Sequence, residues 1–255
     1  MVFLLMIGAG ACLLLSRMVW EAFLNRVIKH ELAFPDFPST LREISIFFIS
    51  DVHRRTISNK IIADVSGKAD FVVIGGDLTE KGVPIHRVRA NLEKLKMLGP
   101  VYFVWGNNDY EGDYHELDAV LLESGVKILD NTAVIFESEQ GEKISLLGVD
   151  DLNQQRDRID LALMDAEEDS FKILACHYPN IAEKILPEHK IRLVLSGHTH
   201  GGQIHLLGYS PYERGSIKKQ KHTTLLISNG YGTTAVPLRL GAPAECHLVT
   251  IRNTR

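Results

Sequence analysis

The chain has 255 residues, of which 45% are hydrophobic and 24% charged, and its formal net charge is −4. This length suits one large α/β domain, and the balance is ordinary for a globular core. Because there is no basic excess, we expect no nucleic-acid partner. The three cysteines, Cys12, Cys176 and Cys246, give no disulfide framework, which favours a reducing compartment.

The N-terminus is strongly apolar. Up to Leu15 no side chain is polar except the Cys12 thiol. Extended through Trp20, with Arg17 reaching toward the interface, a helix here would be about 30 Å long, which matches the hydrocarbon core of a bilayer. We therefore predict a single membrane anchor over residues 1–20. The alternatives are a cleaved signal sequence and an amphipathic helix that lies on the membrane or folds against the domain.

The distribution of basic residues predicts an orientation for this anchor. Arg17, Arg26 and Lys29 follow the apolar run, and no Lys or Arg precedes it. The positive-inside rule therefore predicts a cytoplasmic C-terminal domain.

The segment 21–40 is predicted to be a juxtamembrane helix and a linker. Apolar residues recur at helical spacing from Trp20 to Ile28, and Pro35 and Pro38 then interrupt the pattern. The globular domain is expected over residues 41–255.

Within this domain, apolar runs first alternate with helical periods, an order that indicates a mostly parallel sheet. Strands are predicted over 44–49, 71–74 and 101–105, and helices over 57–65, 84–95 and 117–122. After Gly125 short strands dominate. They are predicted over 126–129, 133–136, 144–147, 171–175, 191–195, 203–206, 224–228 and 247–251, with helices over 154–164 and 181–186. Two packed sheets flanked by helices fit this order.

Residues able to bind metal follow five of the predicted strands. In α/β sheets the ligand crevice lies at the carboxyl ends of the strands, so these side chains should converge. They are Asp51, His53, Asp77, Asn107, His177, His198 and His200. Imidazole, carboxylate and amide ligands together suit Mn²⁺, Fe, Zn²⁺ or Co²⁺ better than Mg²⁺ or Cu(I). Seven ligands are too many for one ion, but they suit two ions that share a carboxylate, about 3.5–4 Å apart.

This pattern resembles the calcineurin-like metallophosphoesterase superfamily, whose signature reads D-x-H, G-D, G-N-H-[DE], H and G-H-x-H. The runs from Gly197 to Gln203 and from Gly230 to Glu245 are similar to the membrane-associated bacterial phosphodiesterase branch. The resemblance implies an α/β fold in the form of a four-layer α/β/β/α sandwich with two mixed sheets, here joined to the N-terminal membrane-anchor helix.

The resemblance also implies how the ligands are shared and what they do. One ion would be held by Asp51, His53, Asp77 and His200, and the second by Asp77, Asn107, His177 and His198. A hydroxide bridging the two ions would be the nucleophile, and Asp77 would serve both ions.

One position departs from the family signature. Asn108 stands where the family has a histidine that contacts the phosphoryl group and helps to protonate the leaving group. Asparagine can donate a hydrogen bond there but cannot act as a general acid near neutral pH. The metal ligands are complete, so the departure bears on rate and substrate preference.

Four further residues are candidates for substrate contact. Arg54 and Arg55 follow the first ligand loop and could hold a phosphate by a bidentate contact, although a solvated loop arginine is an equal alternative. His115 and His205 lie near the site loops in sequence.

The leading hypothesis is an anchored enzyme that hydrolyses a phosphodiester or a pyrophosphate, with a lipid-linked compound as one candidate. A phosphomonoesterase or protein phosphatase is the second hypothesis, although Trp105-Gly106 stands where the Ser/Thr phosphatases have Arg-Gly. The third is a metal-binding scaffold whose chemistry faded with the change at Asn108.

Overall fold

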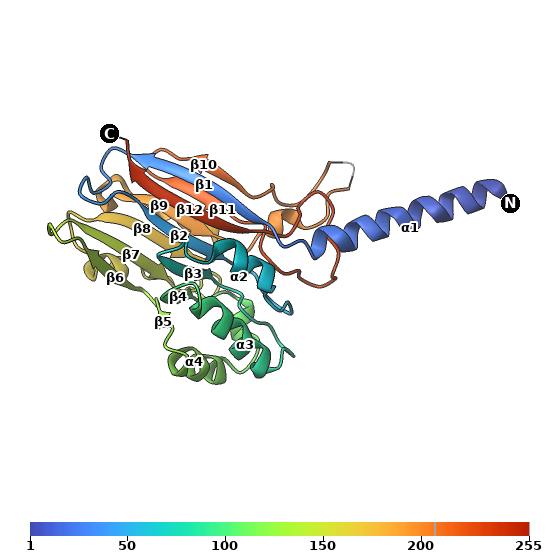
Figure 1. The fold of residues 1–255 in the computed structure, drawn as a ribbon, viewed down its shortest axis with the longest axis horizontal. Helices are drawn as coiled ribbons and strands as arrows, with labels where there is room; N and C mark the ends of the chain where they lie inside the picture. Colours follow the sequence, from blue (N-terminus) through green and yellow to red (C-terminus); the bar gives the residue numbers. More distant parts are fainter. Residues whose placement is uncertain (207, 255) are drawn as a thin grey trace.

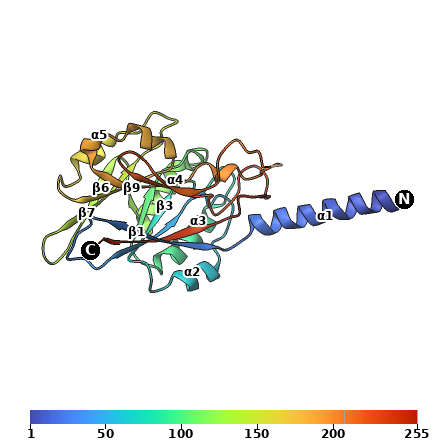
Figure 2. The ribbon, with the colours of Figure 1, turned by 90° about the horizontal axis from the view of Figure 1, so that it is seen from above.

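The structure is a computed structural model that describes residues 1–206 and 208–254. Two six-stranded sheets pack face to face, with helices on both outer sides (Figures 1 and 2). Phe48, Val73, Leu146 and Ile173 are among the fully buried apolar residues between the sheets.

The first sheet has the order β1-β12-β2-β3-β4-β5. β12 runs antiparallel to β2 and the other pairs are parallel, so the sheet is mixed. Its strands are β1 (Val27–Phe34), β2 (Ile44–Ile49), β3 (Phe71–Gly75), β4 (Val101–Val104), β5 (Lys127–Ile128) and β12 (Cys246–Asn253).

The second sheet has the order β10-β11-β9-β8-β7-β6 and is also mixed, because the pairs at its two edges are antiparallel. Its strands are β6 (Thr132–Glu137), β7 (Lys143–Val149), β8 (Phe171–Cys176), β9 (Ile191–Ser196), β10 (Ser216–Lys219) and β11 (Thr224–Ile227).

Helices complete the outer layers. One apolar core joins the first sheet to α2 (Asn59–Val65), α3 (Ile85–Lys96) and α4 (Tyr114–Glu123). Another joins the second sheet to α5 (Ile159–Met164) and the 3₁₀ helix η2 (Pro179–Lys184). Figure 2 shows α2 and α5 on opposite outer sides of the molecule. The predicted four-layer α/β/β/α sandwich with two mixed sheets is therefore confirmed.

The first helix, α1 (Val2–Ala22), projects from one end of the domain (Figure 1). Its 21 residues rise about 31 Å, so by length and composition it could cross a bilayer. The side chains are exposed as far as Arg17, and burial begins at Met18. The predicted apolar helix is present and extends two residues beyond the expected anchor.

The prediction of a helix and linker over residues 21–40 is wrong in part. The helix ends at Ala22, and Val27–Phe34 forms β1, an edge strand of the first sheet. Its side chains alternate in burial, and it pairs in parallel with β12 from Val27↔Cys246 to Phe34↔Asn253. A partner more than 200 residues away overrides the local helical spacing, and the sheet therefore begins before residue 41.

At three further places the structure differs from the predicted elements. Residues 203–206, predicted as a strand, form only isolated bridges in the described part of the chain. The helix predicted over 154–164 is present only as α5, from Ile159. β10 was not predicted, since Ser216–Lys219 carries little apolar pattern.

Candidate metal centre

The structure brings the seven predicted ligands to one end of the two sheets. Asp51 and His53 follow β2, Asp77 follows β3, and Asn107 follows β4. From the second sheet, His177 follows β8, and His198 and His200 follow β9. The buried strands place these loops, so side chains from distant parts of the sequence meet in one region.

Two overlapping groups of ligand atoms have the spacing of metal sites. Asp51, His53 and His200 form one group, and Asp51, Asp77 and His177 form the other, with the ligand atoms of each within 4.8 Å of one another. Nε2 of His200 lies 3.4 Å from Oδ1 of Asp51 and 3.1 Å from Nε2 of His53.

Asp77 lies between the two halves of the site. Its Oδ2 atom is 3.6 Å from Nε2 of His53 and 3.3 Å from Nε2 of His177. The other carboxylate oxygen accepts a hydrogen bond from the backbone N–H of Asn108 at 2.8 Å. One carboxylate oxygen thus faces imidazoles that come from different sheets.

Asn107 and His198 extend the site on the His177 side. Oδ1 of Asn107 lies 3.1 Å from Nδ1 of His198 and accepts a hydrogen bond from the Tyr178 hydroxyl at 3.0 Å. The rings of His198 and Tyr178 are 3.9 Å apart at their centroids. Tyr178 therefore holds both groups in place.

The protonation pattern of His177 fits a bound cation. Its Nδ1 lies 2.8 Å from the carbonyl oxygen of Gly75, which places the proton on Nδ1. The lone pair on Nε2 then faces the Asp77 carboxylate, and Nε2 has no hydrogen-bond partner among the described residues. Two electron-rich atoms in such a buried position are stable only when a proton or a metal ion lies between them.

The charges of His198 and His200 agree with metal binding. Burial lowers the pKa of His200 to about 3, and His53 and Arg239 act in the same direction. Burial, reinforced by His177, lowers the pKa of His198 to about 4. Both rings are therefore neutral near pH 7, the form that binds metal.

At His177 and Asp77, interactions with neighbouring charges outweigh the effect of burial on the pKa. Burial alone would lower the pKa of His177, but the carboxylates of Asp77 and Asp51 outweigh it and raise that pKa to about 10. Burial raises the pKa of Asp77, and His177 and His53 more than offset this, lowering it to about 2. A bound cation would provide the same charge compensation in place of the proton on His177.

The backbone at the ligands is unusual. Positive φ angles are found at Asp51 (54°), His53 (51°), Asp77 (51°), His198 (69°) and His200 (50°). Left-handed backbone at a residue other than glycine costs about 1–3 kcal/mol, and it persists where the surroundings enforce it, as at functional sites. These five ligands thus stand at sharp turns after their strands that direct the side chains into the centre.

Two acidic residues that support the ligands were not predicted. Glu80 lies 3.0 Å from Nδ1 of His53. Asp109 accepts hydrogen bonds from the backbone N–H groups of Asp77, Gly106 and Thr79 at 2.8, 2.9 and 3.0 Å. Both residues stand inside the motifs that signal the site, Gly-Asp-Leu-Thr-Glu and Gly-Asn-Asn-Asp, which is the only sequence signal for them.

Arg239 is a third residue that was not predicted. It is fully buried, and its guanidinium donates hydrogen bonds to the carbonyl oxygens of Asn229, Gly232 and Ala242. It also lies 3.1 Å from Nδ1 of His200. Its signal is its place in the run from Gly230 to Glu245 that marks the family branch.

The four substrate-contact candidates have different environments. Arg54 is exposed beside the site and forms an ion pair with Glu80. His115 is exposed on α4, where its ring packs on Tyr114, and His205 lies 2.7 Å from the carbonyl oxygen of Gly201 and supports that loop.

The phosphate role predicted for Arg55 does not fit its contacts. Its guanidinium donates hydrogen bonds to the carbonyl oxygens of Phe23 and Leu24, both at 3.1 Å, and packs over the Tyr231 ring at 3.8 Å. The end of α1 leaves carbonyl groups without helical partners, and Arg55 satisfies them.

Comparisons with known proteins agree with this geometry. The Bacillus subtilis (strain 168) protein YpbG is 46% identical over 82% of this chain and 81% of its own length. The zebrafish transmembrane protein with metallophosphoesterase domain is 30% identical over 89% of this chain. An uncharacterized metallophosphoesterase of Helicobacter pylori (strain J99) is 31% identical over 80% of it. The matches span only 57% and 58% of the lengths of these last two proteins.

Among solved structures, a 5′-nucleotidase precursor from Thermus thermophilus superimposes with a TM-score of 0.50 at 12% identity, over 82% of this chain and 55% of that one. This likeness concerns the fold. Residues 44–202 match the calcineurin-like phosphoesterase family. The apolar α1 and the transmembrane relative agree with the membrane-associated branch. The chain therefore belongs to the calcineurin-like phosphoesterase family, whose members are metal-dependent hydrolases.

Proposed function

We propose that this protein hydrolyses a phosphodiester or a pyrophosphate with two divalent metal ions bound at the ends of the sheets. The observation that carries the proposal is the position of Asp77, with one carboxylate oxygen between His53 and His177. A carboxylate that faces ligands from both halves of the site is the arrangement expected for a two-metal phosphoesterase. The seven predicted ligands, Asn107 and His198 included, then divide between the two ions around Asp77.

When bound, the ions supply Lewis acidity and lower the pKa of the attacking water. The chain's own residues keep the site in order. The N–H of Asn108 fixes Asp77, and Tyr178 holds Asn107. The Asn108 amide can donate a hydrogen bond to a phosphoryl oxygen, but it cannot protonate a leaving group. Substrates with a good leaving group should therefore react best. We propose Arg54 as the arginine that contacts the phosphoryl group.

The ligand set indicates the class of metal. Imidazole nitrogens and carboxylate oxygens together favour Mn²⁺, Fe, Zn²⁺ or Co²⁺. Elemental analysis of the purified protein would identify the ions and their number. We expect about two ions per chain.

The test of the function uses the full-length chain in detergent, since β1 belongs to the sheet and truncation at residue 41 would remove it. Hydrolysis of bis-p-nitrophenyl phosphate and p-nitrophenyl phosphate is measured with and without added Mn²⁺. We expect metal-stimulated activity with preference for the diester. Asp77→Ala should abolish both activity and metal content. Asp169→Ala should change neither, because Asp169 is exposed on the surface, where it pairs with Lys190. A protein without bound metal and without metal-stimulated activity would contradict the proposal.

We also propose that α1 crosses the membrane once, with the catalytic domain on the cytoplasmic side. Arg17, Arg26 and Lys29 lie at the domain end of the apolar helix, where the positive-inside rule places the cytoplasm. Fusions of alkaline phosphatase and of a fluorescent reporter to the C-terminus test this. Active phosphatase without fluorescence would reverse the orientation.

A further inference from the structure

The base of α1 is fixed to the catalytic domain. The Met18 carbonyl accepts a hydrogen bond from the N–H of Arg239 at 3.0 Å. Glu21 is 3% exposed and accepts a hydrogen bond from the N–H of Gly241 at 2.6 Å, while Arg17 pairs with it at 2.9 Å. With Arg55 holding the last carbonyls, α1 leaves the domain in a set direction. A bilayer around α1 would therefore face one defined surface of the domain.

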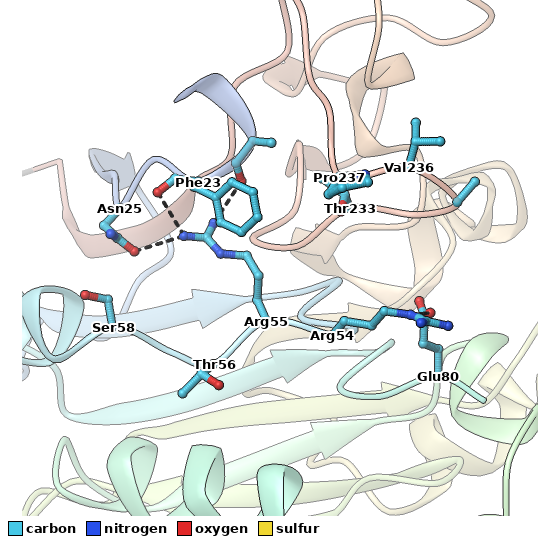
Figure 3. A pocket seen from close by; sticks show the side chains of 12 residues that line it. Phe23, Asn25, Arg54, Arg55, Thr56, Ser58, Glu80, Thr233, Val236 and Pro237 are labelled. Carbon is cyan, nitrogen blue, oxygen red and sulfur yellow. Dashed lines mark hydrogen bonds and ion pairs between the residues drawn. The ribbon is translucent and has the colours of Figure 1, made fainter. Parts of the chain in front are cut away.

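A cavity of about 640 Å³ opens at this junction (Figure 3). Phe23 comes from the end of α1, Val236 and Pro237 from the segment before Arg239, and Arg54 and Glu80 from the metal-centre loops. The apolar side chains and the charged pair lie on different walls. This volume is in the range of sites for molecules the size of a drug or a cofactor.

The polar wall of the cavity adjoins the metal centre. Arg54 directly follows His53, and Glu80 contacts Nδ1 of His53 at 3.0 Å. The apolar wall is joined to the second ligand loop, because the Gln203 amide donates hydrogen bonds to the carbonyl oxygens of Thr234 and Val236 at 3.0 and 3.2 Å. A molecule in the cavity thus lies between the end of α1 and the ligands.

Exposed apolar side chains surround the base of α1. Phe23 is 51% exposed and Val236 45% exposed. Leu206 and Tyr209, both largely exposed, follow Gln203, which contacts the carbonyl oxygens of Thr234 and Val236. Apolar and aromatic residues of this kind are suited to a bilayer interface. Arg54 is also exposed and carries a positive charge, paired with Glu80.

We propose that the cavity receives a phospholipid-type phosphodiester directly from the bilayer. Its acyl part packs against Phe23, Val236 and Pro237, and its phosphoryl group passes Arg54 toward the metal centre. The proposal rests on the proposed function and names the substrate class of the same site. It gives a role to the hydrogen bonds at the base of α1, since a flexible tether would not keep the mouth of the cavity at the membrane surface.

The first test measures binding without catalysis. The full-length chain is reconstituted in phosphatidylcholine vesicles that contain phosphatidylglycerol with a diazirine on one acyl chain, and the labelled residues are mapped after irradiation. We expect labelling of Phe23 and of 233–237, competed by unlabelled phosphatidylglycerol but not by inorganic phosphate. Val236→Asp should reduce it at least about tenfold, because burial of a valine side chain contributes that much to binding. Met164→Asp, at an exposed apolar position on α5, is the matched control and should leave labelling unchanged.

The second test measures turnover of phosphatidylglycerol in vesicles and of soluble bis-p-nitrophenyl phosphate, both with Mn²⁺. Val236→Asp should lower the lipid rate relative to the soluble rate, and Met164→Asp should not. Labelling confined to residues 2–20, or hydrolysis of the soluble diester without lipid turnover, would overturn the inference and leave the proposed function standing. Cavity labelling without metal-dependent hydrolysis of either diester would instead overturn the proposed function.

Discussion

Glu80 lies 3.0 Å from Nδ1 of His53, while Nε2 of the same ring faces Asp77 and His200. At this distance the carboxylate pairs with Nδ1, while Nε2 points toward the other ligands. Burial lowers the pKa of His53, but the nearby carboxylates of Glu80, Asp77 and Asp51 outweigh it and raise that pKa. Glu80 is thus a positioning residue for a ligand.

Replacement of Glu80 should weaken metal binding. We expect Glu80→Ala to lower the affinity for Mn²⁺ about 10–100-fold, the usual effect of removing a partner of a ligating histidine. Glu80→Gln should recover part of this loss, because its amide oxygen can accept a hydrogen bond from the Nδ1–H group. Titration of the metal-depleted protein by calorimetry measures both. Equal affinities of Glu80→Ala and the wild type would show that His53 needs no such support.

Gly106 provides the space that Asp77 occupies. A Cβ atom at residue 106 would lie 2.3 Å from Oδ1 of Asp77 and 2.4 Å from its backbone nitrogen. The neighbouring backbone cannot yield easily, so Gly106→Ala should displace the shared carboxylate. We expect loss of most bound metal and of activity, with the fold retained. Gly112→Ala is the matched control, since nothing lies within 4 Å of its added Cβ. The metal content of both variants shows whether the site is lost, and circular dichroism shows whether the fold is retained.

The ligand set could be read from the sequence because each ligand directly follows an apolar strand. Glu80 and Arg239 could not be assigned in this way, since their roles depend on how side chains pack across segments far apart in the chain. Arg55 shows the same limit. Its position after His53 favours a phosphate contact in the sequence. In the fold, its guanidinium instead donates hydrogen bonds to carbonyl oxygens at the end of α1.

The strand pattern was readable where strands are buried on both faces. Ile44–Ile49 is buried throughout, and its bounds were predicted correctly. Val27–Phe34 is only half-buried at an edge, and its partner β12 ends the chain. Such non-local pairing leaves little trace in local periodicity, which is why this segment was assigned to a helix and linker.

Asn108 offers a test of the missing general acid. Its side-chain oxygen accepts a hydrogen bond from the Asn107 amide at 3.0 Å, next to the shared carboxylate. Asn108→His should accelerate diesters with poor leaving groups, by at most about 10²–10⁴-fold, and change activated p-nitrophenyl esters least. Rates for a series of aryl esters of rising leaving-group pKa measure this. A uniform decrease for every ester would instead assign Asn108 a positioning role through Asn107.

His247 should make the fold sensitive to acid. It is buried on β12, and its Nδ1 lies 3.0 Å from Nε2 of His30, with the two rings stacked. Burial, together with the charges of His30 and Arg26, lowers the pKa of His247 to about 3. Glu245, the acidic group nearest to the ring at 3.8 Å, does not offset this.

The sign of the effect follows from proton linkage. In the unfolded chain the pKa of His247 is near 6.5, so between that pH and about 3 the unfolded state binds a proton that the folded state does not. Stability contributed by the neutral ring is complete above pH 6.5 and falls as the pH decreases. At about pH 5 the loss is ~2 kcal/mol, from 1.36 kcal/mol per unit over about 1.5 units.

His247→Phe keeps an aromatic ring beside Phe48 and removes the titrating group. The free energy of unfolding, measured by urea denaturation in detergent micelles with a chelator present, should then decrease less between about pH 7 and pH 5 than in the wild type, by up to ~2 kcal/mol. The chelator keeps metal release from contributing to the difference. His86→Phe serves as the control, because His86 is exposed and its replacement should leave the wild-type dependence on pH unchanged. Parallel curves for His247→Phe and the wild type would show that the buried histidine pair accepts a proton without cost to the fold.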